Sequence, residues 1–480
     1  MPPALPATAL ARALGDAWRR GHASAPALAD GLRAMVVDGR IAARTRMPSE
    51  RALAPELGVS RGTVTRAYDR LRADGFLVSA RGAGSWLTLP GDAAPAGPTP
   101  PAEAGDGTRR HDLAVAALPA PEPLLADAAA RATRVLARHT AGHGYAPAGL
   151  PELREAVAAR FTARGLATAP DQVLVTAGAQ HALHLVLALL CAPGDRVLVD
   201  APAYPRTLSA LRAARTRPVP VPLTATGWDA EAWADAVAAA APRLAVTMPD
   251  FHNPTGLSMS IAHRGALAGT CARAGVALVA DETNAELRLD GPAPAAPLAA
   301  GDPGGAVITI GSMSKAAWGG LRLGWVRAAP RLVRELAAAR ADLDMASPVL
   351  EQLVGVELMA GWDAVLASRR ALLRPRRDAL FAALAGRAPG WRARRPRGGL
   401  SAWVRLPAPI ASRLAAAAAR RGIVVTPGPS FSVDGTFERH LRLPFTLPAE
   451  ELDAAVTTLA EVAAQIGPAA EAPETLAAAV

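Results

Sequence analysis

Short apolar runs alternate with longer, alanine-rich amphipathic stretches along most of the chain after residue 110. The apolar runs are QVLVT (172–176), DRVLVD (195–200), RLAVTMP (243–249), VALVAD (276–281), AVITIG (306–311) and LRLGWV (321–326). Runs of this length that are rich in Val, Ile and Leu indicate buried strands, and the stretches between them suit helical crossovers. The alternation predicts an α/β domain with a mostly parallel sheet and ligands at the carboxyl ends of its strands.

A different pattern occupies residues 48–89. PSE (48–50) is typical of a helix start, Gly58 of a helix end, and Ser60 of a cap for a second helix over 61–75. That second helix has one apolar face, made by Val64, Ala67, Tyr68 and Leu71, and a basic leading end. Two β-like runs around a glycine-rich turn follow in GFLVSARGAGSWLTL (75–89). This order predicts a winged helix-turn-helix that binds double-stranded DNA.

The composition divides the chain into segments. PGDAAPAGPTPPAEAGDGTRR (90–110) has no apolar periodicity and predicts a flexible linker. Before it, residues 1–89 contain thirteen arginines against seven acidic residues, a net charge of +6. We therefore expect an N-terminal extension (1–26), a DNA-binding domain (27–89), the linker (90–110) and the α/β domain (111–480).

Overall composition narrows the class of protein. The formal net charge of +10 favours a polyanionic partner. Cys191 and Cys271 are far apart in the sequence, which argues against a disulfide framework or a zinc site. His181 and His184 lie one helical turn apart but lack a third ligand, so we expect no metal. The apolar stretch LHLVLALLCA is too short to cross a bilayer, and no signal peptide is indicated. We expect a cytoplasmic protein with no membrane partner.

Lys and Arg together number 52, and Lys315 is the only lysine. An amine, unlike a guanidinium, can lose its proton and attack a carbonyl carbon. A Walker-type phosphate loop is excluded, because Lys315 is preceded by Ser314 and followed by Ala316. The Ser-x-x-Lys pattern of serine acyltransferases is matched from Ser312, but such sites also use a Lys-Thr-Gly strand, and no second lysine exists. The remaining chemistry is a Schiff base to pyridoxal 5'-phosphate.

The groups that such a cofactor needs are present at predicted strand ends. Ser312 and Arg322 flank Lys315 and can hydrogen-bond a phosphate. The turn Gly178, Ala179, Gln180 leads from a strand into a helix, whose free amides suit a phosphate. Asp281 ends another strand, where a carboxylate would keep a pyridine nitrogen protonated. Asn253, in HNPTG, is a donor suited to the phenolic ring oxygen.

The N-terminal motif MPSERALAPELGVSRGTVTRAYDRLRADGFL resembles the winged helix-turn-helix of GntR-type bacterial transcription regulators. The resemblance covers about forty residues. It implies DNA contacts by the helices and the wing, at Arg51, Arg61, Thr63, Arg66, Arg81 and Gly82.

The rest of the chain resembles fold-type I aminotransferases, and with the N-terminal domain it resembles the MocR group of GntR regulators. The motifs include GYAPAGLPELREAVAARF, DAPAYP, HNPTG, GSMSKAAWGGLRLGW and LRLPF. The resemblance implies a fold-type I domain with a small C-terminal α+β subdomain, and a homodimer that shares its cofactor sites. It also implies that Tyr204 lies over or beside the ring, that Tyr145 reaches the phosphate from the partner subunit, and that Arg442 binds an effector or substrate carboxylate.

Thr283 departs from the family pattern, which usually has a tyrosine two residues after the pyridine-binding aspartate. A threonine hydroxyl is shorter and far less acidic, so it stabilises a phenolate less well. This favours a regulator that senses an amine, an amino acid or the cofactor through Lys315. A working aminotransferase with an accessory DNA-binding domain is the alternative.

Overall fold

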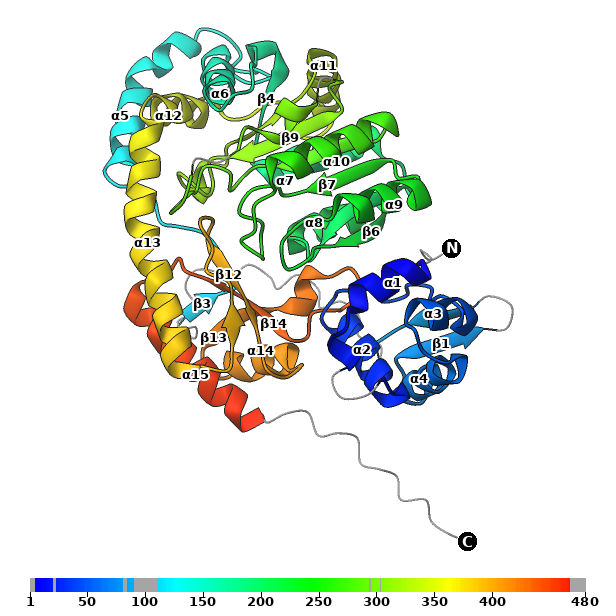
Figure 1. Cartoon of the computed structure of the whole chain (residues 1–480). Coiled ribbons are helices and arrows are strands. Elements are labelled where there is room, and N and C mark those ends of the chain that lie inside the picture. Colours follow the sequence, from blue (N-terminus) through cyan, green and yellow to red (C-terminus); the bar gives the residue numbers. More distant parts are fainter. Residues whose placement is uncertain are drawn as a thin grey trace.

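The structure is a computed structural model that describes residues 5–19, 23–80, 84–89, 111–292, 295–302 and 304–466. Figure 1 shows three lobes: a DNA-binding domain at the N-terminus, a large α/β domain and a small subdomain. The predicted linker, 90–110, lies outside the described residues.

The N-terminal lobe is a winged helix-turn-helix. Ser49 and Ser60 cap its third and fourth helices, and Ser60 Oγ accepts from the backbone N of Thr63 at 3.1 Å. Val64 and Leu71 of the fourth helix are fully buried, as the periodicity predicted. Leu10 and Leu14, within the predicted extension, lie in the same core. The elements are α1 (Ala7–Leu14), a 3-10 turn η1 (Ala17–Arg19), α2 (Ala25–Val37), α3 (Glu50–Glu56), α4 (Arg61–Ala73), β1 (Leu77–Ala80) and β2 (Gly84–Leu87), with β1 and β2 antiparallel.

The large domain is built on a seven-stranded sheet of order β4-β10-β9-β8-β7-β5-β6. Its strands are β4 (Val173–Thr176), β5 (Arg196–Ala201), β6 (Arg217–Pro222), β7 (Leu244–Thr247), β8 (Ala277–Asp281), β9 (Val307–Ser312) and β10 (Gly324–Arg327). Six of them match the apolar runs. β10 is antiparallel to both β4 and β9, because the connection from β9 contains no crossover helix. The sheet is therefore mostly parallel, as predicted.

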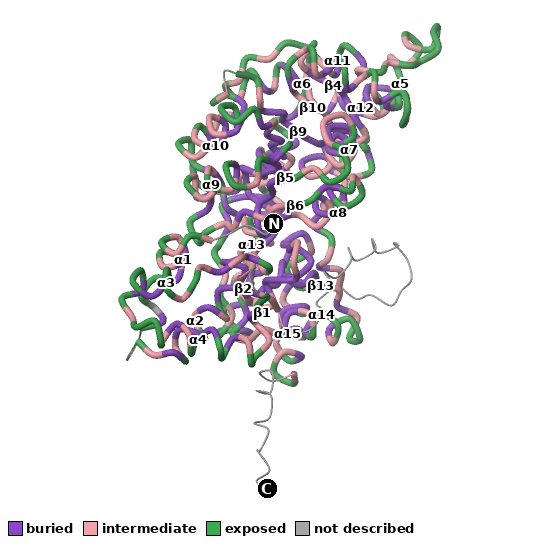
Figure 2. Tube along the Cα trace, turned by 90° about the vertical axis from the view of Figure 1, so that its right-hand side faces the viewer, coloured by how far each residue is buried: buried purple, intermediate pink, exposed green. Residues whose placement is uncertain are grey.

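Helices cover both faces of this sheet. Val197 and Val199 of β5 pack against α7 (Ala179–Leu190), α8 (Pro205–Ala213) and α11 (Pro330–Arg340), while Leu198 between them packs against α9 (Ala230–Ala240) and α10 (Ile261–Arg273). Figure 2 shows the buried strands between more exposed helices. α5 (Leu124–Val135), α6 (Pro151–Ala163) and α12 (Val349–Ala360) form a separate layer beside β4, and the remaining 3-10 turns of the domain are η2 (Leu136–His139), η3 (Pro170–Gln172), η4 (Leu298–Gly301) and η5 (Gly319–Leu321).

The small subdomain holds a five-stranded sheet of order β11-β12-β14-β13-β3. The strands are β3 (His111–Leu113), β11 (Arg392–Ala393), β12 (Ser401–Arg405), β13 (Ile423–Pro427) and β14 (His440–Pro444), and the turn η6 (Gly428–Phe431) follows β13. α14 (Ala411–Ala419) and α15 (Ala449–Ile466) pack on it, and α13 (Trp362–Arg387) runs along both lobes in Figure 1. β3, the first element after the predicted linker, therefore belongs to the small subdomain. Within the described residues, no helix is long and apolar enough to span a bilayer.

Candidate functional site

Lys315 lies three residues after β9, at the carboxyl end of the large sheet. Its Nζ donates a hydrogen bond to the backbone O of Ala116 at 2.8 Å. The pKa of the amine is lowered to about 8, mainly by burial and also by the positive charges of Arg442 and Arg322, while Asp281 opposes the shift. A substantial fraction of this amine is therefore neutral near pH 8, which a carbonyl-attacking lysine requires.

Three strand ends meet beside this lysine. Gly324 of β10 is paired with Thr176 of β4 on one side and with Ser312 of β9 on the other. A Cβ atom at Gly324 would lie 2.6 Å from the carbonyl carbon of Gly178, so the glycine allows the turn after β4 to approach the end of β9. Ser312 Oγ donates to the backbone O of Leu323 at 3.0 Å. The predicted phosphate-binding residues from β4 and β9 are thus brought together.

Arg322 completes this group. Its Nη2 donates to the backbone O of Ala177 at 2.9 Å, and a Cβ atom at Gly178 would lie 3.1 Å from the same nitrogen. Gly178 has φ 97° and is the residue before α7, which begins at Ala179. The first amides of α7, including that of Gln180, have no acceptor in the preceding turn of their own helix. An arginine over a helix N-terminus forms a site for a phosphate.

Asp281 ends β8 and is 9% exposed. Its Oδ1 accepts from the backbone N of Thr283 at 2.9 Å. Burial raises the pKa of this carboxyl, although Thr283 and the positive charge of Lys315 oppose the shift. A buried carboxylate of this kind is stabilised by a cationic partner, and a protonated pyridine nitrogen is such a partner.

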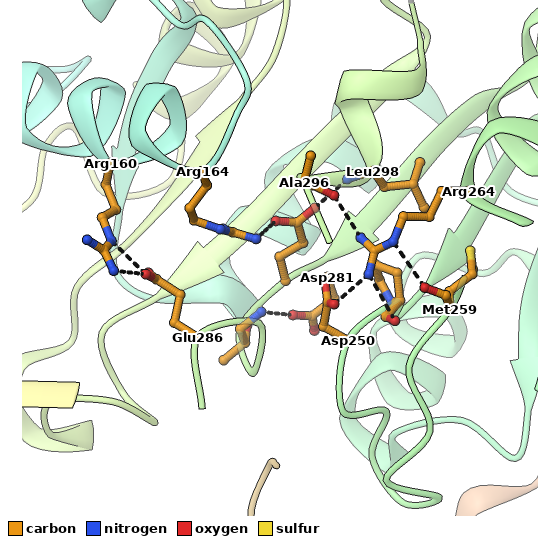
Figure 3. Close-up of polar contacts among 12 residues, drawn as sticks. Arg160, Arg164, Asp250, Met259, Arg264, Asp281, Glu286, Ala296 and Leu298 are labelled. Atoms are coloured by element: carbon orange, nitrogen blue, oxygen red, sulfur yellow. Dashed lines mark hydrogen bonds and ion pairs between the residues drawn. The ribbon is translucent and has the colours of Figure 1, made fainter. Parts of the chain in front are cut away.

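Two ion pairs fasten the segment that carries Asp281 to α6. Glu282 Oε2 lies 2.8 Å from Arg164 Nη2, and its other oxygen accepts from the backbone N of Leu298. Glu286 pairs with Arg160 at 2.5 Å. Figure 3 shows Arg160, Glu286 and Arg164 to the left of Asp281, and Arg264, which lies 2.5 Å from Asp250, to its right. These pairs were not predicted from the sequence, although the two glutamates that closely follow Asp281 could have indicated them.

Asn253 and Thr283 lie near the end of the same sheet. Asn253 Oδ1 is buried and has no hydrogen-bond partner among the described residues. The Thr283 side chain lines a cavity with Ser312, Trp325 and Trp362. The chain has three tyrosines, and one of them, Tyr68, is buried in the DNA-binding domain. A phenol could therefore be supplied only by the other two.

Tyr204 lies in the large domain and Arg442 in the small subdomain, and each affects the pKa of the other. Tyr204 lines a cavity with Asp281, and burial raises the pKa of its phenol while Arg442 lowers it. Arg442, in β14, is 3% exposed, and burial lowers its pKa to about 10. Its Nη2 donates to the backbone O of Ala114 and to Thr426 Oγ1, and its Nε has no partner among the described residues. A buried guanidinium with a free donor suits a carboxylate.

One segment that was not predicted from the sequence contacts two of the cations of the site, Lys315 and Arg442. Backbone carbonyls after β3 accept from Arg442 at Ala114 and from Lys315 at Ala116. Backbone acceptors carry no residue signature, so the sequence offered no signal for them. This segment follows β3, the first described element after the predicted linker.

Other predicted positions lie further out. Tyr145 is 56% exposed and its ring contacts His143 at 5.5 Å. The two histidines of α7 also differ: His181 Nδ1 accepts from the backbone N of Ala177, whereas His184 is exposed. Among the described residues no group of three or more His, Cys, Asp or Glu side chains could hold a metal ion.

The predicted DNA-binding residues lie on α3 and α4. The arginines Arg51, Arg61 and Arg66 are exposed, and none of them forms an ion pair with a described residue. Thr63 is held at the start of α4 by Ser60. Arg81 and Gly82, predicted in the wing, lie outside the described residues.

The arrangement fits pyridoxal phosphate. The neutralisable amine of Lys315, the arginine-capped turn at Gly178, the buried carboxylate of Asp281 and the free oxygen-bearing side chain of Asn253 all face the carboxyl end of one sheet. Lys315 would hold the aldehyde carbon, and Ser312, Arg322 and the start of α7 would hold the phosphate.

Comparisons with known proteins agree with the fold and with the cofactor. Residues 112–459 match the family model "Aminotransferase class I and II", and residues 25–86 match "Bacterial regulatory proteins, gntR family". The HTH-type transcriptional regulator TauR of Rhodobacter capsulatus is 30% identical over 83% of this chain and 88% of its own length. The probable rhizopine catabolism regulatory protein MocR of Rhizobium meliloti is 32% identical over 63% and 64%.

A solved structure is similar over the aminotransferase-like part. Pyrococcus horikoshii kynurenine aminotransferase, in complex with PMP, has a TM-score of 0.69 and 27% identity over 75% of this chain and 91% of its own. The two family models match the chain in the same order as its two domains. This chain belongs to the class I and II aminotransferase family and, through its N-terminal domain, to the MocR-type group of GntR transcription regulators.

Proposed function

We propose that this protein is a transcription regulator whose aminotransferase-like domain senses an amine, an amino acid or pyridoxal phosphate through a Schiff base at Lys315. The observation that carries the proposal is the presence, in one chain, of an unpaired basic surface on α3 and α4 and a lysine whose pKa is lowered to about 8. The cofactor of the domain is pyridoxal phosphate, which when bound supplies an electrophilic carbon and an electron-withdrawing ring.

The DNA partner follows from the winged helix-turn-helix. Arg61, Thr63 and Arg66 on α4 would meet the major groove and its phosphates, with Arg51 on the backbone and Arg81 and Gly82 in the wing. Arginines that neutralise phosphates release the cations condensed on the DNA, so affinity should fall steeply as the salt concentration rises. Replacing Arg66 with Ala should weaken binding and make this salt dependence shallower.

The effector would be a small molecule with an amine and a carboxylate. The amine would react where Lys315 lies, and the carboxylate would take the free Nε donor of Arg442. Asp281 would keep the pyridine nitrogen protonated, Asn253 and Thr283 would lie near the ring oxygen, and Tyr204 would limit the space over the ring. Position 283 holds a threonine and not a tyrosine, which favours sensing of the effector over its efficient transamination.

A working aminotransferase is the second candidate. It is favoured by the completeness of the phosphate, pyridine and carboxylate sites and by the similarity to a kynurenine aminotransferase. Such an enzyme would use Lys315 in its neutral form as the base that moves a proton at the substrate's α-carbon.

We further propose a cytoplasmic homodimer. Tyr145 is 56% exposed and its ring lies against His143, which leaves its phenol available to the cofactor site of a partner subunit. Exposed apolar side chains lie close by on the same side, namely Leu343, Met345 and Leu350. A Cβ atom at Gly144 would lie 4.0 Å from Val349 Cγ2, and Arg340 donates to the backbone O of Pro147, so the segments that carry these side chains lie near Tyr145. A regulator of bacterial transcription needs access to DNA, which favours the cytoplasm.

Two measurements test the proposal. Purified protein should be yellow, and Lys315→Ala should abolish the colour; a variant that keeps it would refute the role of Lys315. A gel shift on the DNA upstream of the protein's own gene should then respond to pyridoxal phosphate and to a panel of amino acids. Retardation that never responds would argue against sensing, and keto-acid formation over many turnovers would favour the enzyme.

A further inference from the structure

The DNA-binding domain touches the small subdomain at the end of α2. The backbone N of Phe437 donates to the backbone O of Val37 at 2.9 Å. The Phe437 ring fills the space beside Gly39, where a Cβ atom would lie only 2.1 Å from it. Gly39 also has φ +69°, so glycine is required at this position on both counts. We call this contact the dock.

Charged side chains surround the dock. Asp38, which lies between Val37 and Gly39, is 3.1 Å from Arg405 Nη2 and 3.6 Å from Arg439 Nε. Its side chain is 13% exposed, so these pairs are shielded from solvent on one side. Both arginines belong to the small subdomain, and the dock therefore combines a backbone hydrogen bond, an aromatic contact and a charge cluster.

Phe437 is part of a group of four aromatic side chains inside the small subdomain, which we call the aromatic cluster: Trp403, Phe431, Phe437 and His440. Trp403 is its centre. It stacks on His440 with ring centroids 5.0 Å apart and planes at 6°, and it meets Phe431 at 5.3 Å and Phe437 at 6.0 Å edge to face. Trp403 therefore contacts both Phe431 and Phe437 and provides a route by which movement of one ring reaches the other.

The other end of the aromatic cluster is Arg442. Its guanidinium carbon lies 5.7 Å from the Phe431 ring centroid, and Arg442 is directly opposite Trp403 in the register of β12 and β14. The same guanidinium also donates to Ala114 and Thr426. A carboxylate that takes the free Nε donor adds a partner to this guanidinium and shifts it relative to the Phe431 ring.

The DNA-binding domain has a second contact, with the large domain. Arg12 of α1 lies 2.6 Å from Glu231 of α9, and both side chains are more than half exposed. Figure 1 shows α1 and α2 beside the small subdomain. An exposed ion pair of this kind contributes little, so the dock dominates the placement of the domain. The exposed arginines of α4 are not part of the dock, so docking sets their direction without covering them.

We propose that the aromatic cluster couples the binding of a carboxylate at Arg442 to release of the dock, with Trp403 as the positioning residue. The coupling rests on the proposed function in one respect, the use of Arg442 as the effector's carboxylate site. Release would free the DNA-binding domain to change the direction of α4 relative to the rest of the molecule.

Hydrogen exchange at the Phe437 amide, the donor in the dock, tests this in the full chain. The probes are N-(5'-phosphopyridoxyl)-L-alanine and N-(5'-phosphopyridoxyl)ethylamine, which differ only in the carboxylate. We expect the alanine adduct to speed exchange in the segment 434–440 by roughly threefold or more, and the ethylamine adduct to leave it unchanged. Equal exchange with the two adducts would overturn the proposal, as would failure of the adducts to bind.

Trp403→Leu isolates the coupling. This variant should still bind the alanine adduct, measured by its absorbance, but its exchange should no longer respond. Trp391→Leu removes another tryptophan of the same subdomain, outside the aromatic cluster, and should respond as the natural chain does. A response retained in Trp403→Leu would exclude the route through Trp403.

A substitute variant and a second assay ensure that the experiment can still contradict the proposal. If Trp403→Leu fails to fold, Phe437→Leu replaces it, because this change breaks the cluster at the dock while leaving the surroundings of Arg442 intact. A gel shift with the same adducts measures DNA affinity and therefore tests the proposed function separately. DNA affinity that ignores the adducts, together with an exchange response, would refute sensing by DNA binding and still support the coupling.

Discussion

At the scale of single residues, the site depends on buried charges that compensate one another. Arg164 and Glu282 form a pair whose side chains are 15% and 2% exposed, next to Asp281. Arg164→Met leaves Glu282 buried without its cation, which should cost about 3–5 kcal/mol. Thermal unfolding followed by near-UV circular dichroism should show a midpoint lower by roughly 10 °C.

The matched control is Arg331→Met. Arg331 pairs with Glu335 at 2.8 Å, but its side chain is 86% exposed, so solvent screens the pair and the change should be nearly silent. Equal melting of the two variants would mean that the pair beside Asp281 does not stabilise the fold.

The pH dependence of cofactor loading is also a single-residue property. An ordinary lysine is only about 0.3% neutral at pH 8, whereas the pKa of Lys315 is lowered to about 8, so about half of it is neutral there. The rate at which cofactor-free protein develops its absorbance with pyridoxal phosphate should therefore rise with pH and level off above pH 8. Arg442→Gln removes a cation that lowers this pKa, so its inflection should move to higher pH.

Asp281→Asn should move the same inflection to lower pH, because the Asp281 carboxylate raises the pKa of the amine. Arg331→Met again serves as the control and should leave the curve in place. An inflection near pH 10 in the natural chain would contradict the lowered pKa.

At the scale of elements, the close approach of β4, β9 and β10 shapes the turn at Gly178, which is predicted to hold the phosphate. A Cβ atom at Gly324 would lie 2.6 Å from Gly178 and 2.7 Å from the backbone O of Gly311. Gly324→Ala must therefore push the turn away from Arg322, at a cost of about 1–3 kcal/mol. We expect pyridoxal phosphate, titrated by absorbance, to bind roughly tenfold or more weakly.

Gly319→Ala is the control for this change. Gly319 lies in the same loop, and nothing lies within 4 Å of a Cβ atom placed there. It should bind the cofactor as the natural chain does. Similar affinities for the two variants would mean that the turn can shift without loss.

The strands that could be predicted from the sequence are those whose residues are both apolar in the sequence and buried in the structure. β8 and β9 are continuous apolar runs, and their end residues Asp281 and Ser312 were expected at the ligand end of the sheet. β6 was not predicted, because every second residue in it is a proline and a proline has no backbone N–H to donate to a neighbouring strand. Prolines are tolerated in this strand because β6 lies at the edge of the sheet. The carbonyls of Ala114 and Ala116 were missed because a backbone acceptor is the same in every residue.

At the scale of the whole molecule, the predicted sharing of cofactor sites between two subunits has a direct test. If Tyr145 reaches the phosphate of the partner subunit, each site combines Lys315 of one chain with Tyr145 of the other. Lys315→Ala alone should bind no cofactor covalently, and Tyr145→Ala alone should bind it weakly in both sites, because a phosphate donor is lost. Neither variant by itself contains an intact site.

Mixed dimers of the two variants behave differently under this arrangement. The site that uses Lys315 from the Tyr145→Ala chain receives Tyr145 from the Lys315→Ala chain, so one of the two sites is restored. Co-refolding the variants should therefore produce a fraction of sites with the affinity of the natural protein, measured by absorbance titration. If Tyr145 served its own chain, every site with a lysine would still lack the phenol, and mixing would restore nothing. Tyr145→Phe in place of Tyr145→Ala then separates loss of the hydroxyl from loss of the ring, because only the hydroxyl can donate to a phosphate.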